Sequence, residues 1–220
     1  MGPWSQGRSG LDSWFWTLYF AGMSIIIPKP LPFEPGALDG ISLDTNVQHH
    51  DALYVGYVNK RNEIEAALET ADRSKAAATY SPFRELKLEE TFNINGQLLH
   101  ECFFDNLGGK GAPPTGALHD QLVADFGSWS EFVADLVACS LAARGWAVMA
   151  WDPSDGKIRN FLCDAHNQGG VWGAVPLLVV DVYEHSYILD HGADRKAYLE
   201  AVLRNLNWAR VKARFEAIQR

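Results

Sequence analysis

The stretch "VPLLVVDVYEHSYILD" (residues 175–190) joins an apolar segment to an aspartate and a histidine, two residue types that are able to bind metals. A short apolar run rich in β-branched residues is typical of a buried strand. The run ends at Asp181, as expected for a strand that emerges into a functional site, and His185 follows four residues later. The pattern fits half of a metal site, and it also fits an ordinary solvated helical turn. The rest of the chain decides between these two interpretations.

The sequence just before this stretch predicts two further strands. Residues 145–165, "GWAVMAWDPSDGKIRNFLCDA", place two apolar segments around the turn "DPSDGK", which indicates a β-hairpin. Residues 128–143 form an amphipathic pattern in which Ser128 is suited to cap a helix. After the third strand, residues 194–220 are helical in pattern, with Asn207 as an internal cap.

The first half of the chain has a different pattern. Residues 42–70 run without proline and repeat apolar side chains at helical spacing, with Asp44 or Thr45 as the expected N-cap. Residues 84–107 form a second helical stretch, and one loop joins the two. The sequence therefore predicts a helical hairpin.

The fold class that follows is α+β. We expect an N-terminal α-helical hairpin domain over residues 31–110, then a C-terminal α/β domain over residues 117–220 with a short three-stranded antiparallel sheet. The glycine- and proline-rich residues 108–117 separate the two domains.

Residues 1–30 are treated as an extension of uncertain status. Its run "WFWTLYFAGMSIII" (residues 14–27) is apolar but short for a membrane span, and it lacks the basic start and cleavage site of a signal peptide. Met23 is an alternative natural start, in which case residues 1–22 are a translated upstream segment.

Composition excludes some classes of function. The 220 residues carry a net charge of -8, which argues against a nucleic-acid partner. No membrane association is expected. The three cysteines are far apart, so neither a disulfide framework nor a cysteine zinc site is predicted, and a reducing, cytoplasmic location is favoured.

Four residues from three segments make a candidate metal site. They are His49 in the first helical stretch, His100 in the second, and Asp181 and His185. A lone histidine on an apolar face is more often a hydrogen-bonded core residue. Three imidazoles and one carboxylate together suit Fe, Mn or Zn.

The sequence resembles the iron/manganese superoxide dismutase family from about residue 31 to residue 215. The stretches that carry the resemblance are "LPFEPGAL", "FNINGQLLHECFF" and "VPLLVVDVYEHSYILD". The resemblance implies one Fe or Mn ion per subunit, bound by His49, His100, Asp181 and His185, with the superoxide anion as substrate.

The resemblance also implies roles for residues around the metal. Tyr57 matches a gateway tyrosine, Trp146 an aromatic wall of the pocket, and Arg195 an arginine near the substrate funnel. Glu184 matches a glutamate that reaches a ligand histidine of a partner subunit, which implies a homodimer or a tetramer built from dimers. Tyr183 stands where the family usually has tryptophan.

Other positions also depart from the family pattern. Leu99 stands where the family has an asparagine before the second histidine, and Phe104 stands where it has a tryptophan after that histidine. Leu53 replaces the gateway histidine, and Ile188 replaces the tyrosine that this histidine meets across the dimer. Losing both partners together leaves no buried polar group unpaired, so the change affects a proton relay rather than the metal site.

The family needs one residue that hydrogen-bonds solvent at the metal, and this sequence offers several candidates. The position on the second helix used by one subset is Gly96, which has no side chain, and Gln97 points to another helical face. In the other subset the residue comes from the second strand of the hairpin, where His166, Asn167 and Gln168 compete. Loop spacing favours His166.

The function predicted from these features is superoxide dismutation. A catalytically degenerate member of the fold with a scaffold role is the alternative, and a zinc hydrolase built on the same ligands is a third hypothesis. The sequence does not choose between iron and manganese.

Overall fold

The structure is a computed structural model that describes residues 25–219. Most of the predicted extension, including Met23, lies outside the described residues. Within residues 25–219, no helix has both the length and the apolar character that a membrane crossing requires.

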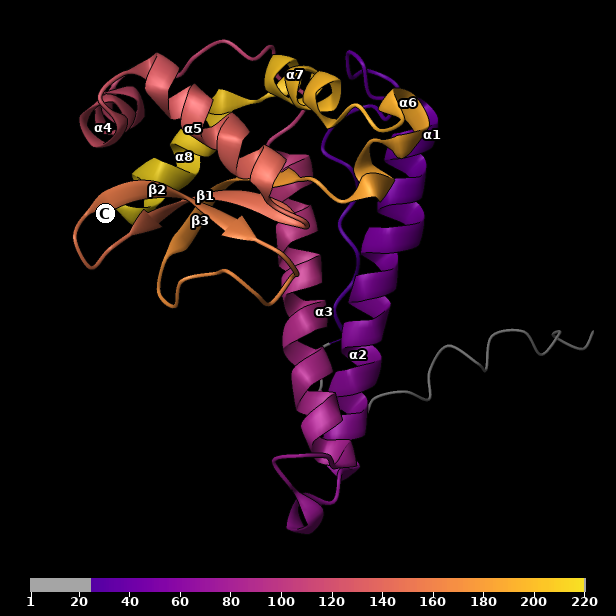
Figure 1. Cartoon of the computed structure of the whole chain (residues 1–220). Helices are drawn as coiled ribbons and strands as arrows, with labels where there is room; N and C mark the ends of the chain where they lie inside the picture. The colour runs from indigo at the N-terminus through magenta and orange to yellow at the C-terminus, as the bar shows by residue number, and fades with distance from the viewer. Residues whose placement is uncertain (1–24, 220) are drawn as a thin grey trace, which may run out of the picture.

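The N-terminal part is an α-hairpin, with its two long helices side by side (Figure 1). Its elements are α1 (Leu43–Val47), the π-helix η1 (Gln48–Tyr54), α2 (Val55–Thr70), the 3-10 helix η2 (Arg73–Lys75) and α3 (Pro82–Asp105). Ser81 caps α3, because its side chain accepts a hydrogen bond from the backbone N–H of Arg84. Pro82 at the first helical position fits there because its missing N–H needs no partner.

The beginning of the first helix differs from the prediction in two ways. Ser42 is the N-cap, and Asp44 and Thr45 are not, because Ser42 has an extended backbone and its Oγ accepts the N–H of Thr45. A π-helical segment then interrupts the run and carries His49. Single π-helical turns are frequent at functional sites. This π-helical segment changes the rotation per residue between His49 and Tyr57. The direction of one side chain relative to the other therefore differs from that in a regular α-helix.

The C-terminal part contains a three-stranded antiparallel sheet in the order β2-β1-β3. The strands are β1 (Trp146–Asp152), β2 (Lys157–Cys163) and β3 (Val175–Asp181), which confirms the predicted hairpin and third strand. Trp146 pairs with Asp181 across β1 and β3, so the register places these two residues directly opposite each other on neighbouring strands.

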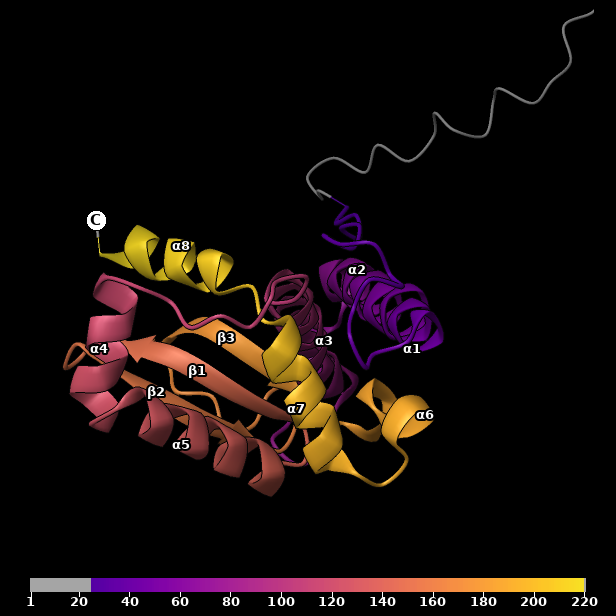
Figure 2. The ribbon, with the colours of Figure 1, turned by 90° about the horizontal axis from the view of Figure 1, so that it is seen from above.

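Helices surround this sheet (Figure 2). The helices of the C-terminal part are α4 (Ala117–Phe126), α5 (Trp129–Ala142), the 3-10 helix η3 (Glu184–Ser186), α6 (Ile188–His191), α7 (Arg195–Asn205) and α8 (Trp208–Ile218), and α6 lies away from the sheet, near α1. α5 packs on β1 and β2, whereas α3 and α8 pack against β3. The caps at Ser128 and Asn207 lie where predicted, although Asn207 makes no capping hydrogen bond with its side chain. α4 was not predicted.

One continuous core joins the hairpin to the sheet. It includes Tyr54 and Phe104 from the hairpin and Leu178 from β3, all nearly inaccessible to solvent. The predicted α+β class is thus confirmed. The shared core brings the C-terminal half of α3 against β3, and the metal-site candidates lie at this contact.

Candidate metal centre

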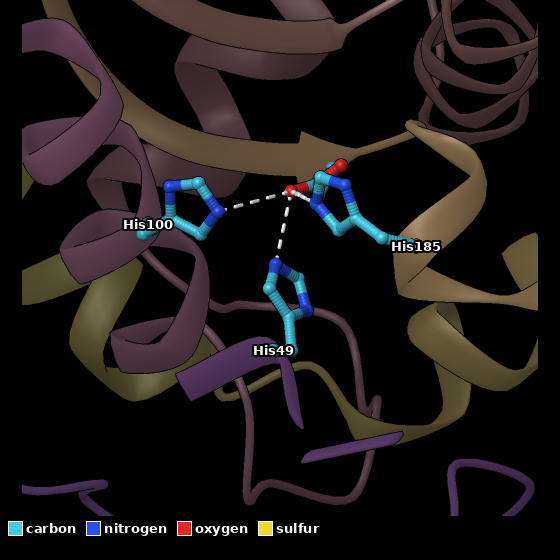
Figure 3. Close-up of side chains that lie close together, drawn as sticks. His49, His100 and His185 are labelled. Carbon is cyan, nitrogen blue, oxygen red and sulfur yellow. Dashed lines mark hydrogen bonds and ion pairs between the residues drawn. The ribbon is translucent and has the colours of Figure 1, made fainter. Parts of the chain in front are cut away.

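Four elements deliver the four predicted metal ligands to one point. His49 comes from η1, His100 from α3, Asp181 from the last position of β3 and His185 from η3. One ligand atom from each lies within 4.8 Å of the others. Figure 3 shows the three imidazoles converging on one carboxylate oxygen, with Nε2 of His49, His185 and His100 at 3.1, 3.2 and 3.6 Å from Asp181 Oδ2.

Burial and charge set the protonation states of this cluster. Burial lowers the pKa of His100 to about 3 and also lowers the pKa of His49, so both imidazoles are neutral. Burial opposes ionisation of Asp181, but the imidazoles of His185 and His49 outweigh it and hold the pKa of the carboxyl well below its usual range. Neutral imidazoles and an ionised carboxylate are the forms that bind metals.

The hydrogen bonds of His100 test whether the cluster fits a metal ion. Its Nδ1 lies 2.5 Å from the carbonyl oxygen of Gly96, which only accepts, so the proton is on Nδ1. The Nε2 lone pair therefore faces the cluster, and this buried atom has no hydrogen-bond partner among the described residues. A buried polar atom without a partner is costly. A cation bound by the four residues would satisfy it, and the donor set therefore fits one metal ion.

Backbone contacts fix the carboxylate of Asp181. Its Oδ1 accepts the N–H of Tyr183 at 2.9 Å, which leaves Oδ2 to face the histidines. The buried phenol of Tyr198 donates to the carbonyl oxygen of Asp181 at 2.8 Å. Sequence reasoning missed Tyr198, and its only signal there is an aromatic position on the apolar face of a helix.

Aromatic rings wall the cluster. The ring of Trp146 lies 4.9 Å from His100 and that of Phe104 lies 5.0 Å from His49. Tyr183 stacks on His185, with ring centroids 5.3 Å apart. Burial and the charge of Asp181 raise the pKa of Tyr183 to about 12, so the phenol stays protonated.

His166 lies beside these rings, and its hydrogen bond identifies its tautomer. The indole Nε1–H of Trp146 donates to His166 Nδ1 at 2.9 Å. Because an indole nitrogen only donates, Nδ1 accepts and the proton of the neutral ring is on Nε2. Burial lowers the pKa of His166 to about 4, which keeps the ring neutral.

The competing candidates lie elsewhere. Gln168 is exposed, and the amide of Asn167 donates to Thr91 on α3. Gln97 hydrogen-bonds Glu101 and Arg61 on the other side of the hairpin, as its helical position predicts.

Tyr57 packs against the site through Gly96. Its ring lies 5.2 Å from the ring of His100 and 4.7 Å from that of His166. A Cβ atom at Gly96 would come within 2.8 Å of Tyr57 Cδ1, so the missing side chain is what makes room for the tyrosine. Burial and the charge of Asp181 raise the pKa of Tyr57.

Arg195 contacts no ligand directly. Its Nη1 donates to the carbonyl oxygen of Ala143 at 2.7 Å, and its Nε donates to the hydroxyl of Tyr187 at 3.3 Å. Tyr187 stacks on Tyr198, which in turn bonds the backbone of Asp181. The arginine is thereby linked to the centre through two buried tyrosines.

Glu184 is exposed beside His185, and its backbone carbonyl accepts the N–H of Tyr187 at 3.1 Å, but among residues 25–219 its carboxylate makes no hydrogen bond or ion pair. The neighbouring Ile188 and Leu189 are about half exposed, at 45% and 55%, and Leu53 is half-buried. Ile188 and Leu189 follow Glu184 closely in the chain, and we call the three residues Glu184, Ile188 and Leu189 the Glu184 surface.

Three imidazoles and one carboxylate, held in an aromatic enclosure between an α-hairpin and a small sheet, define a mononuclear metalloprotein. Comparison with known proteins narrows this class. The description "Iron/manganese superoxide dismutases, alpha-hairpin domain" matches residues 28–108, and "Iron/manganese superoxide dismutases, C-terminal domain" matches residues 114–214.

Individual superoxide dismutases are similar to this chain over most of their length. The chain is 42% identical over 200 residues to an iron superoxide dismutase of Aquifex aeolicus, covering 89% of this chain and 93% of that protein. It is 43% identical over 188 residues to the iron enzyme of Aquifex pyrophilus, covering 83% and 88%. A manganese superoxide dismutase of Halobacterium salinarum is 36% identical over 193 residues, covering 85% and 93%. The chain belongs to the iron/manganese superoxide dismutase family.

Proposed function

We propose that this protein disproportionates superoxide at one Fe or Mn ion per subunit, held by His49, His100, Asp181 and His185. The observation that carries the proposal is the buried Nε2 of His100, which lacks a partner and faces two imidazoles and a carboxylate within 4.8 Å. Such an ion supplies one-electron exchange, so that one superoxide leaves as dioxygen and a second, with two protons, leaves as hydrogen peroxide.

In this proposal His166 is the residue that hydrogen-bonds solvent in the centre. The bond from Trp146 supports the role, because it occupies Nδ1 and leaves Nε2–H free to donate. The lowered pKa supports it as well, since a neutral ring keeps the same donor at ordinary pH. Trp146 is then a positioning residue that sets the tautomer of His166.

Tyr57 acts beside His166 as a second proton-bearing group. Its raised pKa keeps the phenol protonated, so it is able to donate and to order water. The contact of its ring with His166 supports a shared path for the protons that peroxide formation consumes.

Arg195 attracts the anionic substrate. A protein with a net charge of -8 repels superoxide at long range, so a local cation near the entrance favours its approach. The link from Arg195 through Tyr187 and Tyr198 to Asp181 supports a fixed position for this charge near the centre.

The Glu184 surface joins two subunits in this proposal. A carboxylate on the far N–H of a ligand histidine fixes its tautomer and raises its basicity, and second-shell partners of this kind are common. The exposure of Glu184 and its apolar neighbours supports a partner's histidine as its target. A cytoplasmic location is proposed on the cysteine pattern alone, since all three thiols are free.

Metal analysis tests the function. The purified protein is reconstituted separately with Fe and Mn and assayed for bound metal and superoxide turnover, beside His185→Ala and the control His119→Ala on α4. Wild type and the control are expected to bind one ion per subunit and to be active, and His185→Ala is expected to lose both. Full occupancy and turnover in His185→Ala would refute the ligand set. A zinc-only protein or one that binds no metal would favour the hydrolase or the scaffold instead.

A further inference from the structure

Tyr198 on α7 is a fully buried tyrosine whose hydroxyl contacts the backbone of a candidate metal ligand. The exposed fraction of this residue is 0%. A buried phenol needs a hydrogen-bond partner, because an unpaired polar group in the core is costly. The partner is the carbonyl oxygen of Asp181, at 2.8 Å. Because a carbonyl only accepts, the hydroxyl of Tyr198 donates its one hydrogen to this oxygen.

The carbonyl that Tyr198 contacts lies where the chain leaves the sheet. Asp181 is the last residue of β3, an edge strand of the described sheet. From Asp181 the chain turns into η3, which carries His185. The peptide group after Asp181 therefore begins the turn that joins two of the proposed ligands. A hydrogen bond to its oxygen restrains the backbone from which both side chains project.

Other hydrogen bonds close the same turn, but the carbonyl of Asp181 depends chiefly on the tyrosine of α7. Ser186 Oγ lies 2.6 Å from the carbonyl oxygen of Tyr183 and 3.3 Å from that of Asp181. A hydroxyl has one hydrogen, and the shorter of its two contacts makes the stronger hydrogen bond. The hydrogen of Ser186 is therefore assigned to Tyr183, which leaves Tyr198 as the main donor to Asp181.

Packing fixes the direction from which Tyr198 approaches. Its ring stacks on that of Tyr187, with centroids 5.3 Å apart, and lies 6.0 Å from the ring of His191. The helix that carries it, α7, packs against α5 and α6 (Figure 2). Held between these neighbours, the ring presents its hydroxyl to the carbonyl of Asp181 from a constant direction.

We propose that Tyr198 is a positioning residue for the metal centre, and that its hydrogen bond holds the turn between Asp181 and His185 in the arrangement that binds the ion. This role rests on the proposed function, because it needs both residues to be ligands. The hydroxyl acts through the backbone, since it bonds the carbonyl of Asp181 and not the carboxylate. Removal of a group that orients metal ligands typically lowers metal affinity or activity by about 10- to 100-fold.

The test measures how fast Mn-loaded protein loses its metal to an excess of EDTA at raised temperature. Tyr198→Phe removes the hydroxyl and keeps the ring that stacks on Tyr187. We expect this variant to lose its metal about 10-fold faster than wild type, at the lower end of the range for such groups. Its Mn EPR spectrum should also change, because the spectrum reports the geometry of the ligands. Neither measurement depends on turnover.

Tyr54→Phe is the matched control. Tyr54 is 1% exposed, and its hydroxyl donates to Glu101 at 3.0 Å and accepts the backbone N–H of Lys29 at 2.8 Å. Neither partner is a proposed ligand. Urea unfolding of the metal-free proteins should show a loss of stability in both tyrosine variants, and a cooperative transition shows that each is folded. Only Tyr198→Phe should release its metal faster.

Ser186→Ala compares the two hydroxyls of the turn. Because the hydrogen of Ser186 is assigned to Tyr183, this variant should release its metal more slowly than Tyr198→Phe does. A larger effect of Ser186→Ala would overturn the role of Tyr198. Equal acceleration in Tyr198→Phe and Tyr54→Phe would also overturn it, because it would show a general effect of lost core contacts.

The same measurements separate this inference from the proposed function. A wild-type protein that binds neither Fe nor Mn would overturn the ligand set and the role of Tyr198 together. A wild type that holds one ion per subunit, with the same rate of loss and the same EPR spectrum in Tyr198→Phe, would overturn the role of Tyr198 alone.

Discussion

The indole N–H of Trp146 donates a hydrogen bond of 2.9 Å to Nδ1 of His166, and this bond determines which nitrogen of His166 carries the proton. Trp146 lies at the start of β1, paired with Asp181, so the same strand register positions the carboxylate of the candidate metal centre and the donor to His166. A glutamine at position 166 offers the same pair of groups, with its carbonyl to accept from Trp146 and its amide to donate.

His166→Ala is expected to keep its metal and lose activity by about 10- to 100-fold, as is common when a group just outside the metal ligands is removed. His166→Gln should retain more activity than His166→Ala, because it restores both hydrogen bonds. Trp146→Phe should shift the reduction potential of the bound metal and leave the metal content unchanged, because His166 loses the hydrogen bond that fixes its tautomer. Turnover, metal content and potential are measured for each variant, with Gln168→Ala as the control. Loss of activity in Gln168→Ala and not in His166→Ala would move the role to Gln168.

Gly96 provides a second prediction through its contact with Tyr57. Gly96→Ala puts a Cβ 2.8 Å from the tyrosine ring, so the ring must move away from His100 and His166. We expect a loss of about 1–3 kcal/mol in the free energy of unfolding, as for other overpacked sites, together with reduced turnover. Denaturant unfolding and activity assays measure the two effects.

Gly56→Ala is the matched control for this substitution. Gly56 is also helical, on α2, but a Cβ there meets nothing within 4 Å. It should raise stability by up to about 1 kcal/mol through better helix propensity and leave turnover unchanged. Equal effects of the two substitutions would mean that the Tyr57 contact does not matter.

The sequence predicts most of this fold because its local patterns agree with one another. The hairpin around "DPSDGK", the apolar third strand and the cap at Ser128 each follow from residue type and spacing, and the structure confirms them. The N-cap at Ser42 was missed because Asp44 and Thr45 are equally good capping residues. Only the backbone conformation distinguishes them.

The surroundings of the candidate centre were less predictable. Spacing along a chain does not reveal the π-helical turn at His49, which depends on packing against the rest of the molecule. Nor does it reveal that Tyr198 bonds the backbone of Asp181, because the two residues meet only through tertiary structure. The need for glycine at position 96 likewise becomes visible only once Tyr57 is placed against it.

A substitution on the Glu184 surface is expected to prevent the association of subunits. Ile188→Lys places a charge among half-exposed apolar side chains, so the particle mass should fall by half. Turnover should fall with it, because Glu184 then loses its proposed histidine partner. Leu88→Lys is the control, since Leu88 is similarly exposed, at 44%, but lies in the first half of α3. A fully active monomeric Ile188→Lys would show that Glu184 has no role across an interface.

Asp105 at the end of α3 connects the acid stability of the protein to α8. Its carboxylate accepts hydrogen bonds from the guanidinium groups of Arg210 and Arg214, and Arg214 also donates to Asn106 and to the carbonyl of Leu177. Burial opposes ionisation of Asp105, but the two arginines outweigh it and lower the pKa of the carboxyl. Because the pKa is lower in the folded protein than the unfolded value of about 3.9, the carboxylate adds stability above that pH and loses the contribution as the pH falls below it.

Asp105→Asn should therefore lower the free energy of unfolding near neutral pH by about 1 kcal/mol or less, since Asp105 is partly exposed and solvent screens the pair. The difference from wild type should shrink as the pH falls below about 4, where the wild-type carboxyl also becomes protonated in the unfolded state. Urea unfolding of the wild type and Asp105→Asn from neutral to acid pH measures this difference in free energy and its change with pH. Asp44→Asn, on the exposed side of α1, is the control. A difference that stays constant with pH would mean that Asp105 acts through packing rather than charge.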